Sequence, residues 1–105
     1  MSAPNIIQLM HGVTTNVNGA AARLHFTPGI YQATVDGTGV ISVTVTIQGS
    51  LDGVNWVAVG SAISLSGTTT DTDKLLNTEP WPFVRAVTSS ITGTGATVRA
   101  FVSGS

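Results

Sequence analysis

The chain contains no cysteine, and only 9% of its 105 residues are charged, four of them basic and five acidic. The absence of cysteine excludes a disulfide framework and any cysteine-ligated metal site. A soluble domain usually carries about 25% charged residues, so this composition predicts a surface that a partner covers in part. The length suits one compact domain, because a chain of this size can bury a core without cross-links.

The scarcity of charge and of long apolar runs also excludes several classes of partner. Four basic residues provide no footprint for nucleic acid, which requires several phosphate contacts, and no polybasic patch for a membrane surface. The apolar runs are much shorter than the ~20 residues of a membrane-spanning helix, and the first residues lack the pattern of a secretory signal. We therefore expect no nucleic acid and no membrane as partners, and synthesis and assembly in a cytoplasm.

Thr and Val dominate the sequence, and strong helix formers are scarce, which favours β-strands throughout. The clearest strand is expected at residues 40–48, where four aliphatic residues alternate with Ser, Thr and Gln with a period of two. The turn that follows predicts a hairpin to residues 54–59, closed by Ser50, Asp52 and Gly53. In this hairpin Trp56 is expected to bury its ring in the core.

Turn residues divide the rest of the chain into further short strands. Residues 20–26 and 30–35 are expected to form a second hairpin that places Leu24, Phe26, Tyr31, Ala33 and Val35 in the core and turns Arg23, His25, Gln32 and Thr34 outward. Strands at 61–66, 83–88 and 96–103 are separated by a long loop, 67–82, and by a Gly-Thr-Gly turn at 93–95. Seven to eight short strands predict an all-β fold, a single antiparallel β-sandwich of jelly-roll or immunoglobulin-like type.

The first residues do not show the alternation of an exposed strand. Ile6, Ile7, Leu9 and Met10 make both faces of residues 5–10 apolar. Such a segment is either a central strand covered on both sides or an arm that docks against another subunit. We therefore treat residues 1–19 as an N-terminal arm or edge strand and residues 20–105 as the sandwich domain.

The sequence lacks the patterns that support catalysis or metal binding. His11 and His25 have no third ligand at zinc spacing, and the Asp71-x-Asp73 pair lacks the further positions of a calcium loop. The many hydroxyl residues include no Gly-x-Ser-x-Gly elbow and no Ser-x-x-Lys motif. We predict that the protein is not an enzyme, with no catalytic residues, no metal and no cofactor.

The remaining candidates are surface residues that could bind a partner. Three of the four basic residues are arginines on expected strands, and arginine is favoured at protein interfaces. The long loop contributes two charged residues and a tryptophan, and the N-terminal segment contributes four apolar residues. The candidate partner-binding residues are Ile6, Ile7, Leu9, Met10, Arg23, Asp73, Lys74, Trp81, Arg85 and Arg99.

Three segments carry a resemblance to a known group of proteins. Residues 49–60 contain a Ser-x-Asp-Gly-x-x-Trp hairpin, residues 81–86 contain an aromatic-Val-Arg strand, and residues 92–98 contain Gly-Thr-Gly before the last strand. Together they resemble small virion proteins of tailed bacteriophages, over roughly residues 36–105. The resemblance implies a structural protein of the virion, a capsid decoration or cement protein that binds the major capsid protein lattice as a homotrimer on the capsid surface.

The same hairpin and Val-Arg pairing also resemble discoidin-type sandwiches that bind carbohydrate or lipid, although those domains are longer. Two alternatives therefore stay open. The first is a carbohydrate-binding module, which would need Trp81 or Tyr31 on the surface as a stacking platform. The second is a tail or neck subunit, which would form rings or open polymers.

Overall fold

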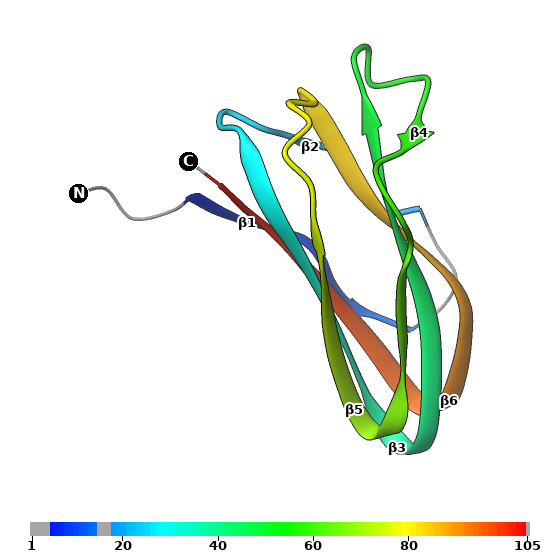
Figure 1. The fold of residues 1–105 in the computed structure, drawn as a ribbon. Coiled ribbons are helices and arrows are strands. Elements are labelled where there is room, and N and C mark those ends of the chain that lie inside the picture. The colour runs from blue at the N-terminus through cyan, green and yellow to red at the C-terminus, as the bar shows by residue number, and fades with distance from the viewer. Residues whose placement is uncertain (1–4, 15–17, 105) are drawn as a thin grey trace.

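A computed structural model describes residues 5–14 and 18–104, and this part of the chain consists of strands, turns and loops without a helix. The predicted fold class, an all-β antiparallel sandwich, is confirmed. No helix in the described residues is therefore long and apolar enough to cross a membrane. The six strands, which belong to one sheet (Figure 1), are β1 (Asn5–Val13), β2 (Ala22–Arg23), β3 (Pro28–Ser50), β4 (Val57–Ala58), β5 (Ile63–Leu76) and β6 (Phe83–Gly104).

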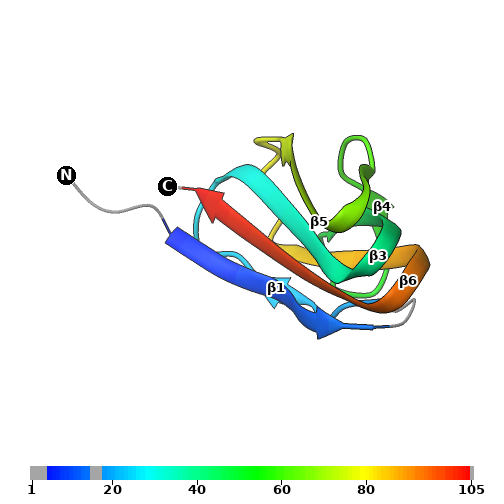
Figure 2. The same cartoon turned by 90° about the horizontal axis from the view of Figure 1, so that it is seen from below.

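Three of these strands are long and bend near their middle, so that the sheet folds over on itself (Figure 1, Figure 2). β3 pairs with β6 along its length, from Pro28 opposite Gly104 to Ser50 opposite Phe83, and β5 pairs with the other edge of β3. We call the two layers A and B. Layer A contains β1, the first half of β3 and the second halves of β5 and β6, and layer B contains the other halves with β2 and β4. Several expected short strands are therefore halves of single bent strands.

The bend lies where two Gly-Thr-Gly segments meet. Thr38 of β3 pairs with Thr94 of β6, and the register of both strands shifts beside this pair. At Gly37 a Cβ would lie 2.7 Å from the Cγ2 atom of Ile41, so the absence of a side chain allows the close approach. The expectation of a turn at 93–95 between two strands is wrong, because these residues form a corner inside one strand.

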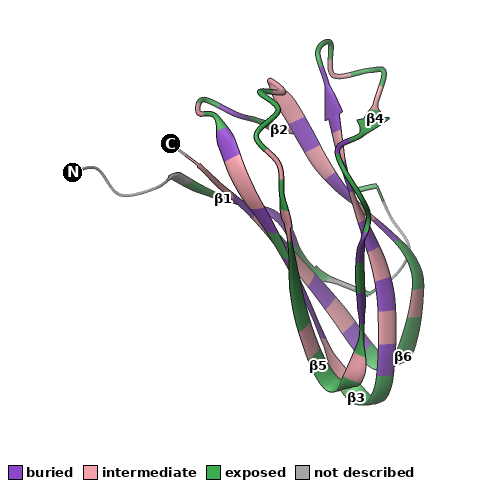
Figure 3. Ribbon diagram, in the orientation of Figure 1, coloured by how far each residue is buried: buried purple, intermediate pink, exposed green. Residues whose placement is uncertain are grey.

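The core lies between the two layers and follows the period-two alternation of β3 and β6. Figure 3 shows the alternating bands of buried residues along both strands. The alternation predicted for residues 40–48 is confirmed, and Leu24 is also buried as predicted. Phe26 packs against the core and is only half-buried. The core side chains of β3 are Tyr31, Ala33, Val35, Ile41, Val43, Val45 and Ile47, and those of β6 include Val84, Ala86, Val98, Ala100 and Val102.

The pairing of several segments differs from the sequence-based prediction. The expected hairpin between residues 20–26 and 30–35 is wrong, because β2 pairs with β6 and the first half of β3 lies between β5 and β6. The expected loop 67–82 is also wrong in its first part, since β5 continues to Leu76. The partner strand expected at 54–59 is reduced to the two residues of β4. Thr34 lies on the outward side of β3 as expected, between the core residues Ala33 and Val35, but it is covered there, and its Oγ1 lies 3.0 Å from that of Thr72.

β1 is the last strand at one edge of the sheet and pairs with β6 alone. Leu9 and Met10 are both buried, although they are consecutive, because the register shifts between Gln8 and Met10. Ile7 packs against the core, whereas Ile6 is 68% exposed. The described part of the N-terminal segment is therefore an edge strand of the same sheet, and most of its apolar character serves the core.

Candidate interaction surfaces

The outer face of layer A carries a row of apolar side chains that crosses neighbouring strands. Ile6 of β1 and Ile30 of β3 both lie opposite Ser103 of β6, and Leu76 of β5 lies opposite Ile30. Phe101 occupies the next outward position of β6. Ile6 and Leu76 are 68% and 67% exposed, and Ile30 and Phe101 are half-buried. We call these four side chains the apolar face.

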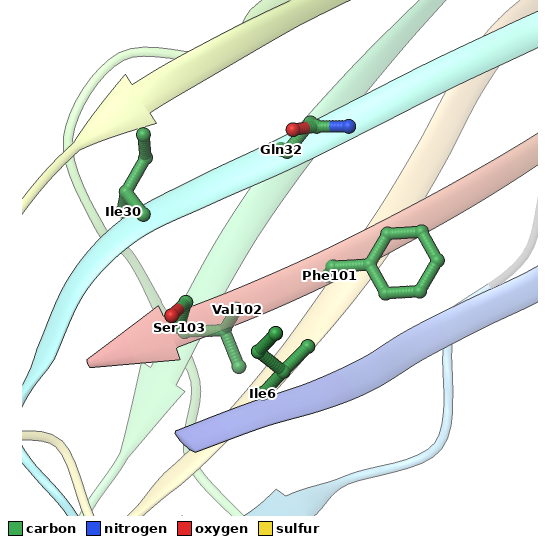
Figure 4. A pocket seen from close by; sticks show the side chains of 6 residues that line it. All are labelled: Ile6, Ile30, Gln32, Phe101, Val102 and Ser103. Atoms are coloured by element: carbon green, nitrogen blue, oxygen red, sulfur yellow. The ribbon is translucent and has the colours of Figure 1, made fainter. Parts of the chain in front are cut away.

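A hollow lies in the middle of the apolar face. Figure 4 shows Ile6, Ile30 and Phe101 around it, with Gln32 and Ser103 as its polar neighbours. The side chains come from β1, β3 and β6, and β6 lies between β1 and β3 and hydrogen-bonds to both. The sheet thus holds an exposed apolar hollow in a fixed shape, which is the kind of surface that binds another molecule.

The margin of the apolar face is polar. Lys74 of β5 lies opposite Gln32 and is exposed. Further along the layer, an Nη of Arg99 lies 2.6 Å from an Oδ of Asp36. A hydrogen bond from Thr70 and the Arg99 guanidinium lower the pKa of Asp36 from its ordinary value. The charge of Arg99 is therefore engaged in an ion pair within the chain.

The hairpin at residues 50–57 is closed by one carboxylate. Asp52 accepts hydrogen bonds from the backbone N–H groups of Val54 at 2.8 Å and Asn55 at 2.9 Å. The Asn55 side chain and the Ser50 hydroxyl also donate to it, each at 2.9 Å. These bonds, led by that from the Asn55 backbone, hold the pKa of Asp52 well below its usual range. Gly53 takes the positive φ of 77° that the turn needs.

Trp56 does not lie in the core, so the expectation of a buried ring is wrong. The ring is half-buried, and the Cζ atom of Arg85 lies 4.4 Å from its centroid. The Nε–H of Arg85 donates to the Oε1 atom of Gln48 at 2.8 Å. Val54 and Ala58, two residues before and after Trp56, are also exposed. Only two residues of this hairpin pair with β3. The Trp56 ring lies on the outer face of layer B, because Arg85 points outward between the buried residues Val84 and Ala86.

Trp81 lies at the end of the core next to a second hollow. Its indole packs directly on Gly49, where a Cβ would lie 2.4 Å from the ring. The Nε1–H donates to Glu79 at 3.2 Å, and Leu51 and Pro80 complete the hollow. Tyr31, the other aromatic considered as a platform, is fully buried, and burial together with the Glu79 charge raises its pKa to about 12.

The candidate partner-binding residues do not form a single site. Ile6, Lys74 and Arg99 lie on the outer face of layer A, whereas Arg23 and Arg85 lie on that of layer B. Ile7, Leu9 and Met10 pack in or against the core, Trp81 closes one end of it, and Asp73 is exposed on β5.

Sequence reasoning did not include Ile30, Leu76 or Phe101 among the partner-binding residues. Each has an outward position next to inward-facing neighbours, and this alternation along a strand is a signal that the sequence contains. Their grouping depends on the register of strands that are distant in sequence, and no local pattern reveals that register.

The described residues contain no group of three or more His, Asp or Glu side chains that could hold a metal ion. Comparison of the chain with models of known protein families, with characterised proteins and with solved structures finds no match.

Proposed function

We propose that this chain is a non-enzymatic structural protein of a tailed-bacteriophage virion. In this role it is a capsid decoration, or cement, protein that binds the major capsid protein lattice as a homotrimer on the capsid surface and stabilises the head. The resemblance of residues 49–60, 81–86 and 92–98 supports the virion role. The protein would be made in the host bacterial cytoplasm and act without a cofactor.

The apolar face is the observation that supports binding to a lattice. Its side chains project from adjacent paired strands, so little conformational entropy is lost when a partner covers them. The low charge of the chain fits a surface that is covered in its working state. A face of this kind can dock on a flat protein surface without rearrangement of the sheet.

A protein that binds only the assembled shell stabilises it by mass action. At a free concentration of a hundred times Kd, each occupied site contributes about 2.7 kcal/mol to the assembled state. The effect is repeated over every site of the lattice, so modest contacts at one site oppose the outward pressure of packaged DNA. Trimerisation would add avidity, because one docked copy raises the local concentration of the other two.

The test uses heads that lack this protein, from the phage whose genome encodes it. Purified protein is sedimented with these heads, and its native mass is measured by light scattering. We expect co-sedimentation and a mass of about three chains. The double substitution Ile6→Ser and Leu76→Ser should weaken binding at least tenfold, because both side chains are exposed on the apolar face.

Val40→Ser is the matched control, because Val40 is 77% exposed and lies at the bend, away from the apolar face. It should bind like the unchanged protein. Leu9 is unsuitable as a probe, since it is buried and its substitution would lower stability. Normal binding by the double variant would contradict the role of the apolar face, and a concentration-independent mass of one chain would contradict the trimer.

The hollow at Trp81 favours a second candidate function, carbohydrate binding. Its indole, the Glu79 carboxylate and Leu51 combine an aromatic surface with a hydrogen-bond acceptor, as sugar-binding sites do. A glycan array separates the two proposals. A retained glycan whose binding is lost in Glu79→Gln would favour the carbohydrate-binding module.

A further inference from the structure

The guanidinium of Arg85 is held in a fixed position on the outer face of layer B. It stacks on Trp56 at 4.4 Å from the ring centroid, and its Nε–H donates to Gln48 at 2.8 Å. Gln48 is the residue opposite Arg85 in the β3–β6 register, so the sheet itself places the acceptor. These two contacts use the ring-facing surface and the Nε–H of the guanidinium. The two Nη groups are left to donate hydrogen bonds to an incoming oxyanion.

A second cation lies close to Arg85 on the same face. Arg23 of β2 pairs with Phe83, two residues before Arg85 on β6, and it is exposed. Residues in such a diagonal position of an antiparallel pair lie about 7–8 Å apart, within reach of long side chains. Both side chains are outward, because their neighbours Ala22 and Val84 pack toward the core. Arg85 and Arg23 can therefore contact one ligand together.

Neither Arg85 nor Arg23 forms an ion pair within the described part of the chain. The ion pair found there joins Arg99 and Asp36. Asp52, on the hairpin that carries Trp56, already accepts four hydrogen bonds inside that hairpin. Arg85 is also half-buried, and a half-buried cation without an acid gains more from an added anion than a fully solvated one does.

We propose that Arg85 and Arg23, with Trp56 as the supporting surface, form a binding site for the carboxylates of an acidic segment of a partner protein. The Arg85 Nη groups would receive one carboxylate in bidentate form, and Arg23 would pair with a neighbouring one. Nucleic acid is the less favoured ligand, because two cations neutralise too few phosphates for useful affinity in a chain of net charge −1. The site stands apart from the apolar face and does not depend on the virion role.

The test is an NMR titration of the whole protein at about 10 mM ionic strength, where screening is weak. The probes are a hexaglutamate peptide and a hexaglutamine peptide of equal length. We expect hexaglutamate to shift the signals of the Arg85 Nε–H and the Trp56 Nε1–H and to leave that of the Arg99 Nε–H in place. Hexaglutamine should cause no saturable shift.

Variants then assign the binding to Arg85. Arg85→Gln should weaken hexaglutamate binding about tenfold or more, followed through the Trp56 signal, because a charge-assisted bidentate contact is lost. Arg85→Lys keeps the charge but lacks the planar donor fork, so it should bind more weakly than the unchanged protein and more tightly than Arg85→Gln. Arg23→Gln should cause a smaller loss.

Arg99→Gln is the matched control, because it removes an equal charge that is already paired with Asp36. An equal loss in Arg99→Gln and Arg85→Gln would overturn the proposal, since binding would then depend on net charge alone. Equal affinity for the two peptides would overturn it as well. Tighter binding of a single-stranded oligonucleotide than of hexaglutamate would replace the acidic protein segment with nucleic acid as the ligand.

Discussion

Gly93 is the residue at which the corner of the sheet depends most on the absence of a side chain. Its φ is 124°, and a Cβ there would lie 2.6 Å from the Cγ2 atom of Ile41 and 2.9 Å from the carbonyl oxygen of Val40. Both contacts are closer than van der Waals packing allows, and one of them is with backbone that cannot move aside. A side chain at this position would therefore combine backbone strain with a lack of space.

We predict that Gly93→Ala lowers the free energy of unfolding by about 2–3 kcal/mol, measured by urea denaturation. Gly95→Ala is the control, because Gly95 also has a positive φ, 64°, but a Cβ there would meet no atom within 4 Å. This variant should lose only about 1 kcal/mol, the cost of the left-handed conformation. Equal losses in the two variants would show that the close approach to Ile41 contributes nothing.

Among the elements, the hairpin at residues 50–57 depends on the charge state of Asp52. Its lowered pKa means that the ionised carboxylate of Asp52 is more stable in the folded hairpin than in the unfolded chain. This contribution to stability is fully present above the ordinary pKa of 3.8 and is lost as the pH falls through the lower folded value. Acid should therefore weaken the hairpin only at pH values below the ordinary range of aspartate.

We predict that Asp52→Asn is less stable than the unchanged protein at pH 7 and that this difference shrinks between pH 4 and pH 2. Urea denaturation at several pH values measures both stabilities. Asp73→Asn serves as the control, because Asp73 is exposed and accepts a hydrogen bond from the N–H of the next residue, Lys74. Its stability difference should be small at every pH. A constant difference for Asp52→Asn across the pH range would contradict the role of its charge.

The elements also show which parts of the fold can be predicted from sequence. The strand at residues 40–48 was predictable because it lies between two neighbouring strands in layer B. One of its faces is buried in the core and the other is open, which produces strict alternation of apolar and polar residues. The second half of β5 was not, since it is an edge segment with exposed Thr, Asp and Lys residues that are typical of a loop. Edge strands bury too little to leave a clear pattern.

The candidate surfaces were predictable only in part, for a related reason. Arg85 was identified because arginine is common at interfaces. Its stacking on Trp56 was not predictable, because Trp56 belongs to the hairpin at residues 50–57 and Arg85 to β6. The apolar face likewise requires the register of β1, β3, β5 and β6. Composition indicates which side chains are available, whereas long-range register decides which of them meet.

At the scale of the whole molecule, the two layers are made of the same strands. β3, β5 and β6 each continue from one layer into the other through the bend, and the buried side chains of both layers form one core. A layer that opened alone would expose the core face of the other and break strands at the bend. The paired residues of β3 and β6 are also far apart in sequence, so folding should be slow, in the range of milliseconds to seconds.

We predict that the two layers unfold in a single cooperative transition. Val98→Ala in layer A and Val45→Ala in layer B each remove a fully buried branched side chain, and each should lower the free energy of unfolding by about 2 kcal/mol. Native-state hydrogen exchange measures the effect at the backbone amides of both layers. Because the core is shared, either substitution should lower the protection of the slowest-exchanging amides in both layers by the same free energy. A variant that lowers protection in its own layer alone would show that the bend separates two independently unfolding units.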